Sequence, residues 1–262
     1  MVFELIGPAG CGKTTVARLV DRALDERGVD HVGWAELEAA DRRFGEKRIT
    51  RYNFPGKTWM LLPLFLRHPS VVAGVFALAL LHGPPQKRRI RQANRALAHV
   101  RMVKRFARRH PGRVLVLHEG LLQMLWSTTV ESEQLRGRWI VRHLLRRYQR
   151  ILAPRGILFR IDDQSAQERV FQRTSGNRFS VTSSEQRRRE FPRWLAYHRE
   201  LVAMAPPGLI AATVDATQPV ETLARNVTDA ILACVATPDA ARSAGSGAAP
   251  PPEGWRAEHR SL

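Results

Sequence analysis

The stretch Gly7-Pro8-Ala9-Gly10-Cys11-Gly12-Lys13-Thr14, followed by Thr15, decides the fold. It matches the pattern G-x-x-x-x-G-K-[S/T], in which glycines let backbone N–H groups approach phosphate oxygens closely. That pattern requires a strand before it and a helix after it. The residues VFELI (2–6) form a short apolar run typical of a buried strand, and apolar residues recur at helical spacing from Val16 until Gly28. The sequence therefore predicts a phosphate-binding loop over residues 7–15.

The loop residues predict the chemistry of the site. Lys13 is expected to reach the β- and γ-phosphates of a nucleotide, and the hydroxyl of Thr14 is expected to ligate magnesium. The helix that follows presents its unpaired N–H groups and the positive end of its dipole to the same anion. Cys11 is expected to be a small, packed spacer within the loop. ATP and Mg²⁺ are the predicted cofactors.

Further buried strands are predicted along the chain, and helical patterns separate most of them. Strands that alternate with helices indicate a parallel sheet with helices on both faces, which is an α/β fold. We expect one domain over residues 1–236. The stretch 237–262 contains SAGSGAAPPPEG and few apolar residues, so it is predicted to be a disordered tail. The predicted later strands are VDHVGW (29–34), RVLVLH (113–118), GILFRID (156–162) and GLIAATVD (208–215).

Acidic residues follow several of these strands, at the edge where open α/β sheets bind ligands. Glu119 is predicted to bind magnesium through water or to accept the proton of an acceptor hydroxyl; alternatively, it is an acid favoured at a helix N-terminus. His118 is either a hydrogen-bonding partner behind the site or a partly buried structural histidine. Glu36 and Asp41 either contact the acceptor or are solvated helix charges. Asp215 either lies near the adenine or caps the loop before the last helix.

Three arginines lie in the segment ERVFQRTSGNRFS (168–180). Arg169 and Arg173 are four residues apart and hence share a helix face, and Arg178 follows the turn Ser-Gly-Asn. Such a group suits a lid over residues 164–184 that stabilises charge on a transferring phosphoryl group and excludes water. The alternative is an ordinary basic surface.

The segments GPAGCGKTT, RVFQRTSGNR and VDATQPVE, in this order and spacing, resemble the thymidylate-kinase-like group of P-loop kinases. The resemblance covers roughly residues 1–34 and 113–232. It implies a P-loop NTPase fold with a doubly wound, five-stranded parallel sheet, and ATP with Mg²⁺ as co-substrates. It also implies phosphoryl transfer to a small acceptor by a nucleoside or nucleotide kinase.

Two stretches depart from that group. Its Arg-Glu-Pro-Gly-Gly-Thr signature after the second strand is replaced by AELEAADRRFGEKRIT, and its Asp-Arg pair after the third strand is replaced by His118-Glu119. The acceptor site is therefore not that of a standard thymidylate kinase. The predicted function is ATP-dependent transfer to a nucleoside, a nucleotide or a similar small, anionic acceptor. The alternatives are a kinase for a sugar or lipid-linked saccharide at a membrane surface, and a P-loop ATPase or switch that acts through binding.

The sequence predicts a helical insertion over residues 47–112, between the second and third strands. From Lys47 to His118 the chain contains sixteen Lys or Arg and no Asp or Glu. Two apolar blocks (59–66 and 71–82) are separated by the segment RHPS, and Pro63 interrupts the first, so a membrane-spanning helix is not expected. They are either core helices or an interfacial hairpin that lies on anionic lipid beside the amphipathic, basic helix that follows.

The whole chain is strongly basic, with a net charge of +18 and a sequence pI of about 11.4. Such a surplus indicates a polyanionic partner, although no aromatic residues are interleaved with the cations as nucleic-acid binding would favour. The two cysteines, Cys11 and Cys234, provide no disulfide framework, and MVFELIGPAG does not read as a signal peptide. A cytoplasmic protein is therefore expected, with peripheral contact to the inner membrane face as an alternative.

Overall fold

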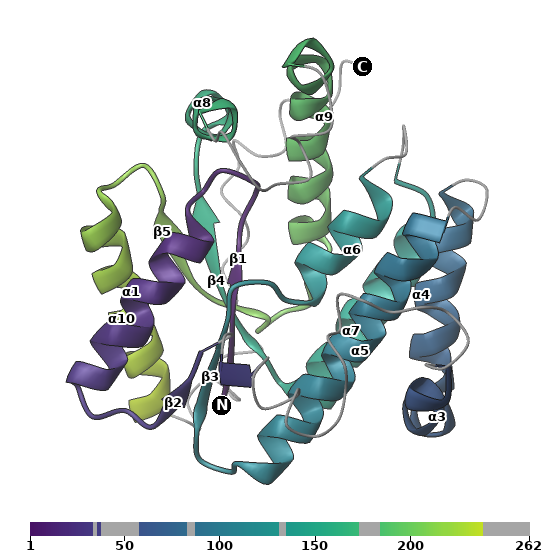
Figure 1. Ribbon diagram of the computed structural model, residues 1–262, viewed down its shortest axis with the longest axis horizontal. Helices are drawn as coiled ribbons and strands as arrows, with labels where there is room; N and C mark the ends of the chain where they lie inside the picture. Colours follow the sequence, from purple (N-terminus) through teal and green to yellow (C-terminus); the bar gives the residue numbers. More distant parts are fainter. Residues whose placement is uncertain (34–35, 38–57, 83–86, 131–134, 173–183, 238–262) are drawn as a thin grey trace.

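The computed structural model describes residues 1–33, 36–37, 58–82, 87–130, 135–172 and 184–237 (Figure 1). The predictions made for Asp41, Arg173, Arg178 and most of the proposed tail fall outside these ranges.

The centre of the molecule is a five-stranded, all-parallel sheet with the order β2-β3-β1-β4-β5. The predicted α/β P-loop NTPase fold is confirmed, because every predicted strand forms and β1 lies in the middle of the sheet. Parallel pairing brings the carboxyl ends of all the strands to one edge, where the residues after β1, β3 and β5 can meet. The strands are β1 (Val2–Ile6), β2 (His31–Val32), β3 (Val114–Leu117), β4 (Arg155–Arg160) and β5 (Ile210–Asp215).

Helices cover both faces of the sheet (Figure 1). On one face, α1 and α10 pack against Phe3 and Leu5 of β1; on the other, α6, α7 and α9 pack in a cluster that includes Ile6. This alternation follows from the period of two in a strand, which sends neighbouring side chains to opposite faces. The helices are α1 (Lys13–Glu26), α3 (Thr58–Arg67), α4 (Pro69–Leu81), α5 (Lys87–Arg109), α6 (Leu121–Thr129), α7 (Arg138–Leu152), α8 (Asp163–Phe171), α9 (Ser184–Ala203) and α10 (Val220–Ala236).

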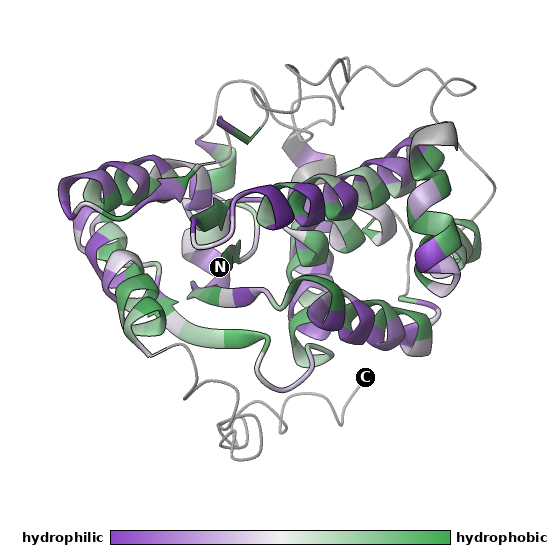
Figure 2. Cartoon of the chain, turned by 90° about the horizontal axis from the view of Figure 1, so that it is seen from below, coloured by the Kyte–Doolittle hydropathy of each residue, from purple (hydrophilic) through white to green (hydrophobic). Residues whose placement is uncertain are grey.

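The described part of the insertion between β2 and β3 is helical, as predicted, and contains α3, α4 and α5. In α5 the predicted apolar side is buried, for example at Leu97 and Val103, while basic residues occupy much of the rest of the helix (Figure 2). In α4, Val75 and Leu78 are almost fully buried in the main cluster, so this helix belongs to the core.

Apolar side chains remain exposed on α3, where Leu66 is 71% exposed. Among the described residues, no single helix is long and apolar enough to cross a membrane. The segments Leu61–Arg67 and Pro69–Leu81 together have the length and composition of a span, but they are bent by 112°.

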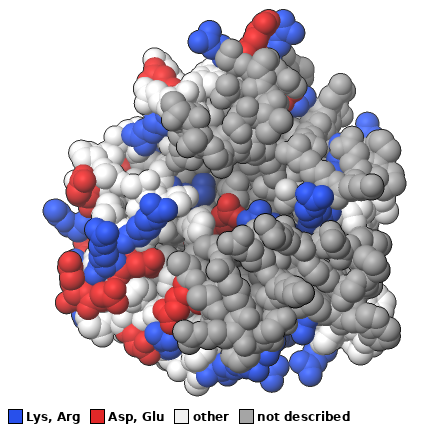
Figure 3. Space-filling view, viewed as in Figure 1, with Lys and Arg blue, Asp and Glu red and all other residues white. Residues whose placement is uncertain are grey.

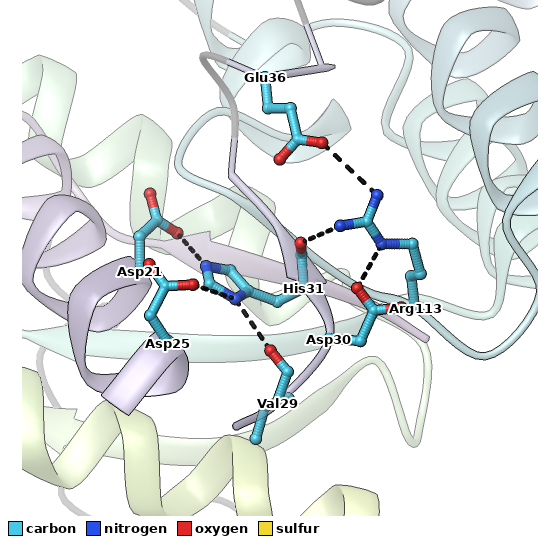
Figure 4. A network of polar contacts seen from close by, with 7 residues as sticks. All are labelled: Asp21, Asp25, Val29, Asp30, His31, Glu36 and Arg113. Atoms are coloured by element: carbon cyan, nitrogen blue, oxygen red, sulfur yellow. Dashed lines mark hydrogen bonds and ion pairs between the residues drawn. The ribbon is translucent and has the colours of Figure 1, made fainter. Parts of the chain in front are cut away.

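The edge strand β2 contains only two residues, and polar contacts hold it in place (Figure 4). Arg113 donates hydrogen bonds to Asp30 Oδ1 at 2.6 Å and to the carbonyl oxygen of His31 at 2.8 Å. On the other side, the buried imidazole of His31 lies 3.7 Å from Asp21 and 3.6 Å from Asp25. These contacts attach the short strand both to the start of β3 and to α1.

Candidate active site

The predicted phosphate-binding loop connects β1 to α1 at the carboxyl edge of the sheet. Gly10 and Gly12 both have φ of +89°, a left-handed conformation that glycine adopts without a steric penalty. Gly12 forms the N-cap of α1, and Lys13 is the first helical residue. The first N–H groups of α1 therefore point toward the loop, as an anion-binding helix N-terminus requires.

The ammonium group of Lys13 lies within this loop. Its Nζ donates hydrogen bonds to the carbonyl oxygens of Gly7 at 2.5 Å and Pro8 at 3.0 Å, and it lies 3.5 Å from Cys11 Sγ. The positive charge is thus held beside the backbone that would surround a phosphate chain. His198 of α9 lies close enough to respond to this charge: burial, together with the charges of Lys13 and Arg199, lowers the pKa of His198 to about 3.

Close packing fixes the shape of the loop. A Cβ at Gly7 would lie 2.6 Å from Cys11 Sγ and 2.9 Å from the Cβ of Phe159. A Cβ at Gly10 would lie 2.5 Å from the carbonyl oxygen of Ala166 in α8. Both glycines are therefore required for space, and α8 packs directly against the loop. The buried thiol of Cys11 is the packed spacer that the sequence predicts.

The loop fits a magnesium–nucleotide. Thr14 and Thr15 are exposed at the start of α1, and Lys13 supplies the cation expected beside the β- and γ-phosphates. Magnesium in such sites is held by few protein ligands together with phosphate oxygens and water. The described residues contain no group of three or more His, Cys, Asp or Glu able to hold a metal ion.

Glu119 follows β3 and forms an ion pair with the insertion. Arg95 Nη2 of α5 donates to Glu119 Oε2 at 2.8 Å, and both side chains are 37% exposed. His99 lies one helical turn after Arg95, and burial, together with the charges of Arg95 and His118, lowers its pKa to about 3. The end of β3 therefore lies against Arg95 and His99 of α5, at the carboxyl edge of the sheet.

A buried carboxyl group of β1, that of Glu4, contacts the segment that follows Glu119. Glu4 is 1% exposed, and its Oε1 accepts a hydrogen bond from the backbone N–H of Leu122 at 3.3 Å. It thereby satisfies one of the unpaired N–H groups at the N-terminus of α6, where Gly120 occupies the N-cap position without a capping side chain. Burial raises the pKa of Glu4 to about 7, while the Leu122 N–H and the nearby Tyr148 hydroxyl act in the opposite direction.

Gly120 leaves the space that Glu4 fills. A Cβ on Gly120 would lie only 1.6 Å from Glu4 Oε1, so any larger residue would collide with the carboxyl group. Because Gly120 directly follows Glu119, this contact also restricts the path of the chain that carries Glu119.

The described part of the predicted lid segment lies mainly in α8. Asp162 caps this helix by accepting from the Ser165 N–H at 2.8 Å, and this hydrogen bond lowers its pKa. Arg169 Nη1 donates to the carbonyl oxygen of Ala216 at 2.7 Å, which ties α8 to the segment after β5. Only Nη1 is engaged in this bond, and a guanidinium has five N–H donors, so Arg169 could keep the carbonyl of Ala216 and still donate to a phosphoryl group.

Asp215 and Glu36 have structural partners. Asp215 accepts from the backbone N–H of Thr217 at 2.9 Å and from its hydroxyl at 2.7 Å, and both bonds lower its pKa. Asp215 therefore caps the loop before the last helix, which is one of the two alternatives that the sequence left open. The carboxylate of Glu36 lies 3.5 Å from Arg113, in the network at the edge strand (Figure 4). An acceptor contact for Glu36 and an adenine contact for Asp215 stay predictions.

Sequence reasoning missed four residues around the site: Glu4, Arg95, His99 and His198. Arg95 and His99 were hidden within the basic insertion, although their spacing of four residues places them on one helix face. Glu4 could have been found as the one charged residue inside a buried strand. Nothing in the pattern of α9 distinguishes His198, whose proximity to Lys13 arises only in the folded chain.

Comparisons with known proteins find only distant likenesses in structure. No protein-family model matches the chain, and no curated protein matches it in sequence. A deoxyadenosine kinase from M. mycoides with products dCMP and a flexible dCDP bound is 13% identical, with a TM-score of 0.48 over 89% of this chain and 100% of that one.

The same kinase with bound dATP gives 13% identity and a TM-score of 0.47, over 88% of this chain and 99% of that one. Shikimate kinase from Acinetobacter baumannii in complex with shikimate is 15% identical, with a TM-score of 0.38 over 88% of this chain and 93% of that one. These likenesses are too distant to transfer a substrate or a residue role to this chain.

Proposed function

We propose that this chain is an ATP- and Mg²⁺-dependent phosphotransferase that moves the γ-phosphoryl group onto a small acceptor. The observation that carries the proposal is the position of Lys13 Nζ, which hydrogen-bonds to Gly7 and Pro8 within a glycine-shaped loop at the N-terminus of α1. We propose a nucleoside or nucleotide as the acceptor, on the strength of the lid and loop motifs.

Each side chain has a distinct role in the proposed reaction. Lys13 and the N–H groups of the loop bind the phosphates and neutralise charge that develops during transfer. Magnesium, when bound, would neutralise the β- and γ-oxygens, with Thr14 as its protein ligand and Glu119 acting through water. Arg169, Arg173 and Arg178 of the lid would add positive charge once the lid has closed.

Glu119 and Arg95 form the acceptor side of the proposed site. With Oε2 of Glu119 bound to Arg95, Oε1 is the atom that would accept the proton of an acceptor hydroxyl or contact a metal-bound water. In the transfer, the acceptor oxygen bonds to the γ-phosphorus, the bond from that phosphorus to the β–γ bridging oxygen breaks, and ADP leaves. The guanidinium of Arg95 would attract an anionic acceptor to this position.

Transfer of label from γ-labelled ATP to panels of nucleosides, nucleotides, sugars and lipid-linked acceptors tests the proposal. We expect a labelled acceptor that depends on magnesium and disappears in Lys13→Ala. The matched control is Arg22→Ala, which removes an exposed cation from the same helix, α1, and should retain transfer.

Release of labelled phosphate to water, with no labelled acceptor in any panel, would refute the kinase and favour a P-loop ATPase or switch. Unchanged transfer in Lys13→Ala would show that the phosphate-binding loop is not the site of the reaction.

A further inference from the structure

A second basic site lies far from the phosphate-binding loop, between α3 and the C-terminal part of α5. It is a groove of about 340 Å³ whose lining contains six Lys or Arg residues, one histidine and no acid among the residues that the structure describes. Arg67 lies at the end of α3, His68 is the N-cap of α4, and α5 contributes cations between Arg101 and Arg109. Basic side chains also line the lower edge of the molecule in Figure 3, where α5 ends in Figure 1.

This groove cannot belong to the site described above. Arg95, in the first half of α5, meets Glu119 at the carboxyl edge of the sheet. Arg105 lies ten residues further along the same helix, or about 15 Å at 1.5 Å per residue. The end of α5 then leads into the start of β3, so the groove lies toward the opposite edge of the sheet.

The cations of the groove are close enough to repel one another. The pKa of Lys104 is lowered by burial and then by Arg67 and Arg108. Burial also lowers the pKa of His68, with Lys104 next among the causes, and the two nitrogens Lys104 Nζ and His68 Nε2 are 2.9 Å apart. A neutral imidazole that accepts from the ammonium group satisfies this contact.

Arg101, Arg105 and Arg109 of the groove have contacts of their own, so the repulsion is assigned to Arg67 and Arg108. Within the described part of the chain, neither Arg67 nor Arg108 forms an ion pair with an acid, and both side chains are exposed. Like charges gathered in a concave site destabilise the fold unless an anion binds between them.

We infer that the α3–α5 groove is a second anion site, which binds a ligand carrying two or more neighbouring phosphate groups. Its volume falls in the range of small-molecule sites, about 300–1,000 Å³, and several cations around one concavity match a multiply charged anion better than a single carboxylate. A soluble polyphosphate compound and adjacent phospholipid headgroups on a membrane surface share this chemistry. The inference does not depend on the proposed kinase activity.

Titration of the full chain with inorganic tripolyphosphate, followed by calorimetry, tests the site. We expect two binding sites in the native protein, one of which is lost in Lys13→Ala. In Arg67→Gln/Arg108→Gln, the Lys13-dependent site should remain and the other should weaken by about tenfold or more, the loss expected for charge-assisted contacts.

The control is Arg22→Gln/Arg225→Gln, which removes two exposed cations from α1 and α10 on the other face of the sheet. It should keep both sites. The inference is overturned if the native protein binds tripolyphosphate only at the Lys13-dependent site, or if the control weakens binding as much as the groove variant does.

Vesicles distinguish the two sources of phosphate. Co-sedimentation is measured with equimolar phosphatidylcholine and phosphatidylglycerol, at low and high salt. Loss of both vesicle binding and the second tripolyphosphate site in the groove variant would support a lipid headgroup as the ligand. Loss of the second site without any vesicle binding would support a soluble polyphosphate. If neither measurement differs between the groove variant and the control, the groove is not an anion site.

Discussion

At the scale of single residues, the least expected feature is the carboxyl group of Glu4 in the middle of the sheet. A buried carboxyl group is costly when ionised, yet this one accepts a hydrogen bond at a helix N-terminus, which favours the ionised form. Desolvation is the larger effect, and the pKa therefore rises from 4.5 to about 7. Glu4 consequently changes its protonation state near neutral pH while it supports the chain that carries Glu119.

This raised pKa predicts that stability falls as the pH rises. The folded chain retains the proton on Glu4 up to about pH 7, whereas the unfolded chain loses it near 4.5. The stabilisation is therefore fully present below pH 4.5 and is lost as the pH rises through about 7. The contribution amounts to about 3 kcal/mol, at 1.36 kcal/mol for each pKa unit.

Urea unfolding of the native chain and of Glu4→Gln at several pH values measures this contribution. The free energy of unfolding of the native chain, relative to the variant, should decrease by about 3 kcal/mol between pH 5 and 8. A difference that stays constant with pH would show that Glu4 is not protonated in the folded chain.

The close contact between Gly120 and Glu4 gives a second prediction. Gly120→Ala forces a Cβ into space that Glu4 Oε1 occupies, and overpacking of this kind typically costs about 1–3 kcal/mol. Glu4→Ala removes the opposing atoms, so the double variant should be less destabilised than the sum of the single variants. Thermal unfolding of the four proteins measures the coupling, and additive losses would mean that the two residues do not interact.

At the scale of elements, the sequence predicts most of the sheet but not which residues of the insertion contact the candidate site. Periods of two and of 3.6 residues are local properties, and for that reason the strands, α1 and the buried side of α5 could be located in advance. The pairing of Arg95 with Glu119 depends on where α5 packs against the end of β3, which no local pattern encodes. The same holds for α8, whose contact with Gly10 becomes apparent only in three dimensions.

The position of α5 predicts that Arg95 affects the reaction more than it affects stability. Arg95→Ala removes a half-exposed ion pair, and such pairs contribute about 0–1 kcal/mol to folding. The same change leaves Glu119 without its orienting partner, and misplacement of a reacting group can reduce kcat/KM by about 100-fold.

Arg27→Ala is the matched control, because Arg27 and Asp229 form an exposed pair of the same length, 2.8 Å, between α1 and α10. Both variants should unfold at similar temperatures, and only Arg95→Ala should lose phosphoryl transfer. Equal activity in the two variants would exclude Arg95 from the acceptor side of the site.

At the scale of the whole molecule, acidic and basic groups are unevenly distributed. Acidic groups gather on the side of α1 and β2 in Figure 3, where Asp21, Asp25 and Asp30 neighbour His31 and Arg113 (Figure 4). The insertion contributes cations without acids, which accounts for much of the net charge of +18. Repulsion among these cations should therefore outweigh attraction in the weak surface ion pairs.

This balance predicts that salt stabilises the protein. Between about 0.01 and 0.1 M salt the Debye length falls from about 30 to about 10 Å, which screens repulsion between distant cations more than it weakens ion pairs in direct contact. The Tm from scanning calorimetry should therefore rise over this range. Because Arg67 and Arg108 contribute to the repulsion around Lys104, the rise should be smaller in Arg67→Gln/Arg108→Gln than in Arg22→Gln/Arg225→Gln. A Tm that falls with salt would mean that ion pairs such as Arg113–Asp30 stabilise the fold more than the excess cations destabilise it.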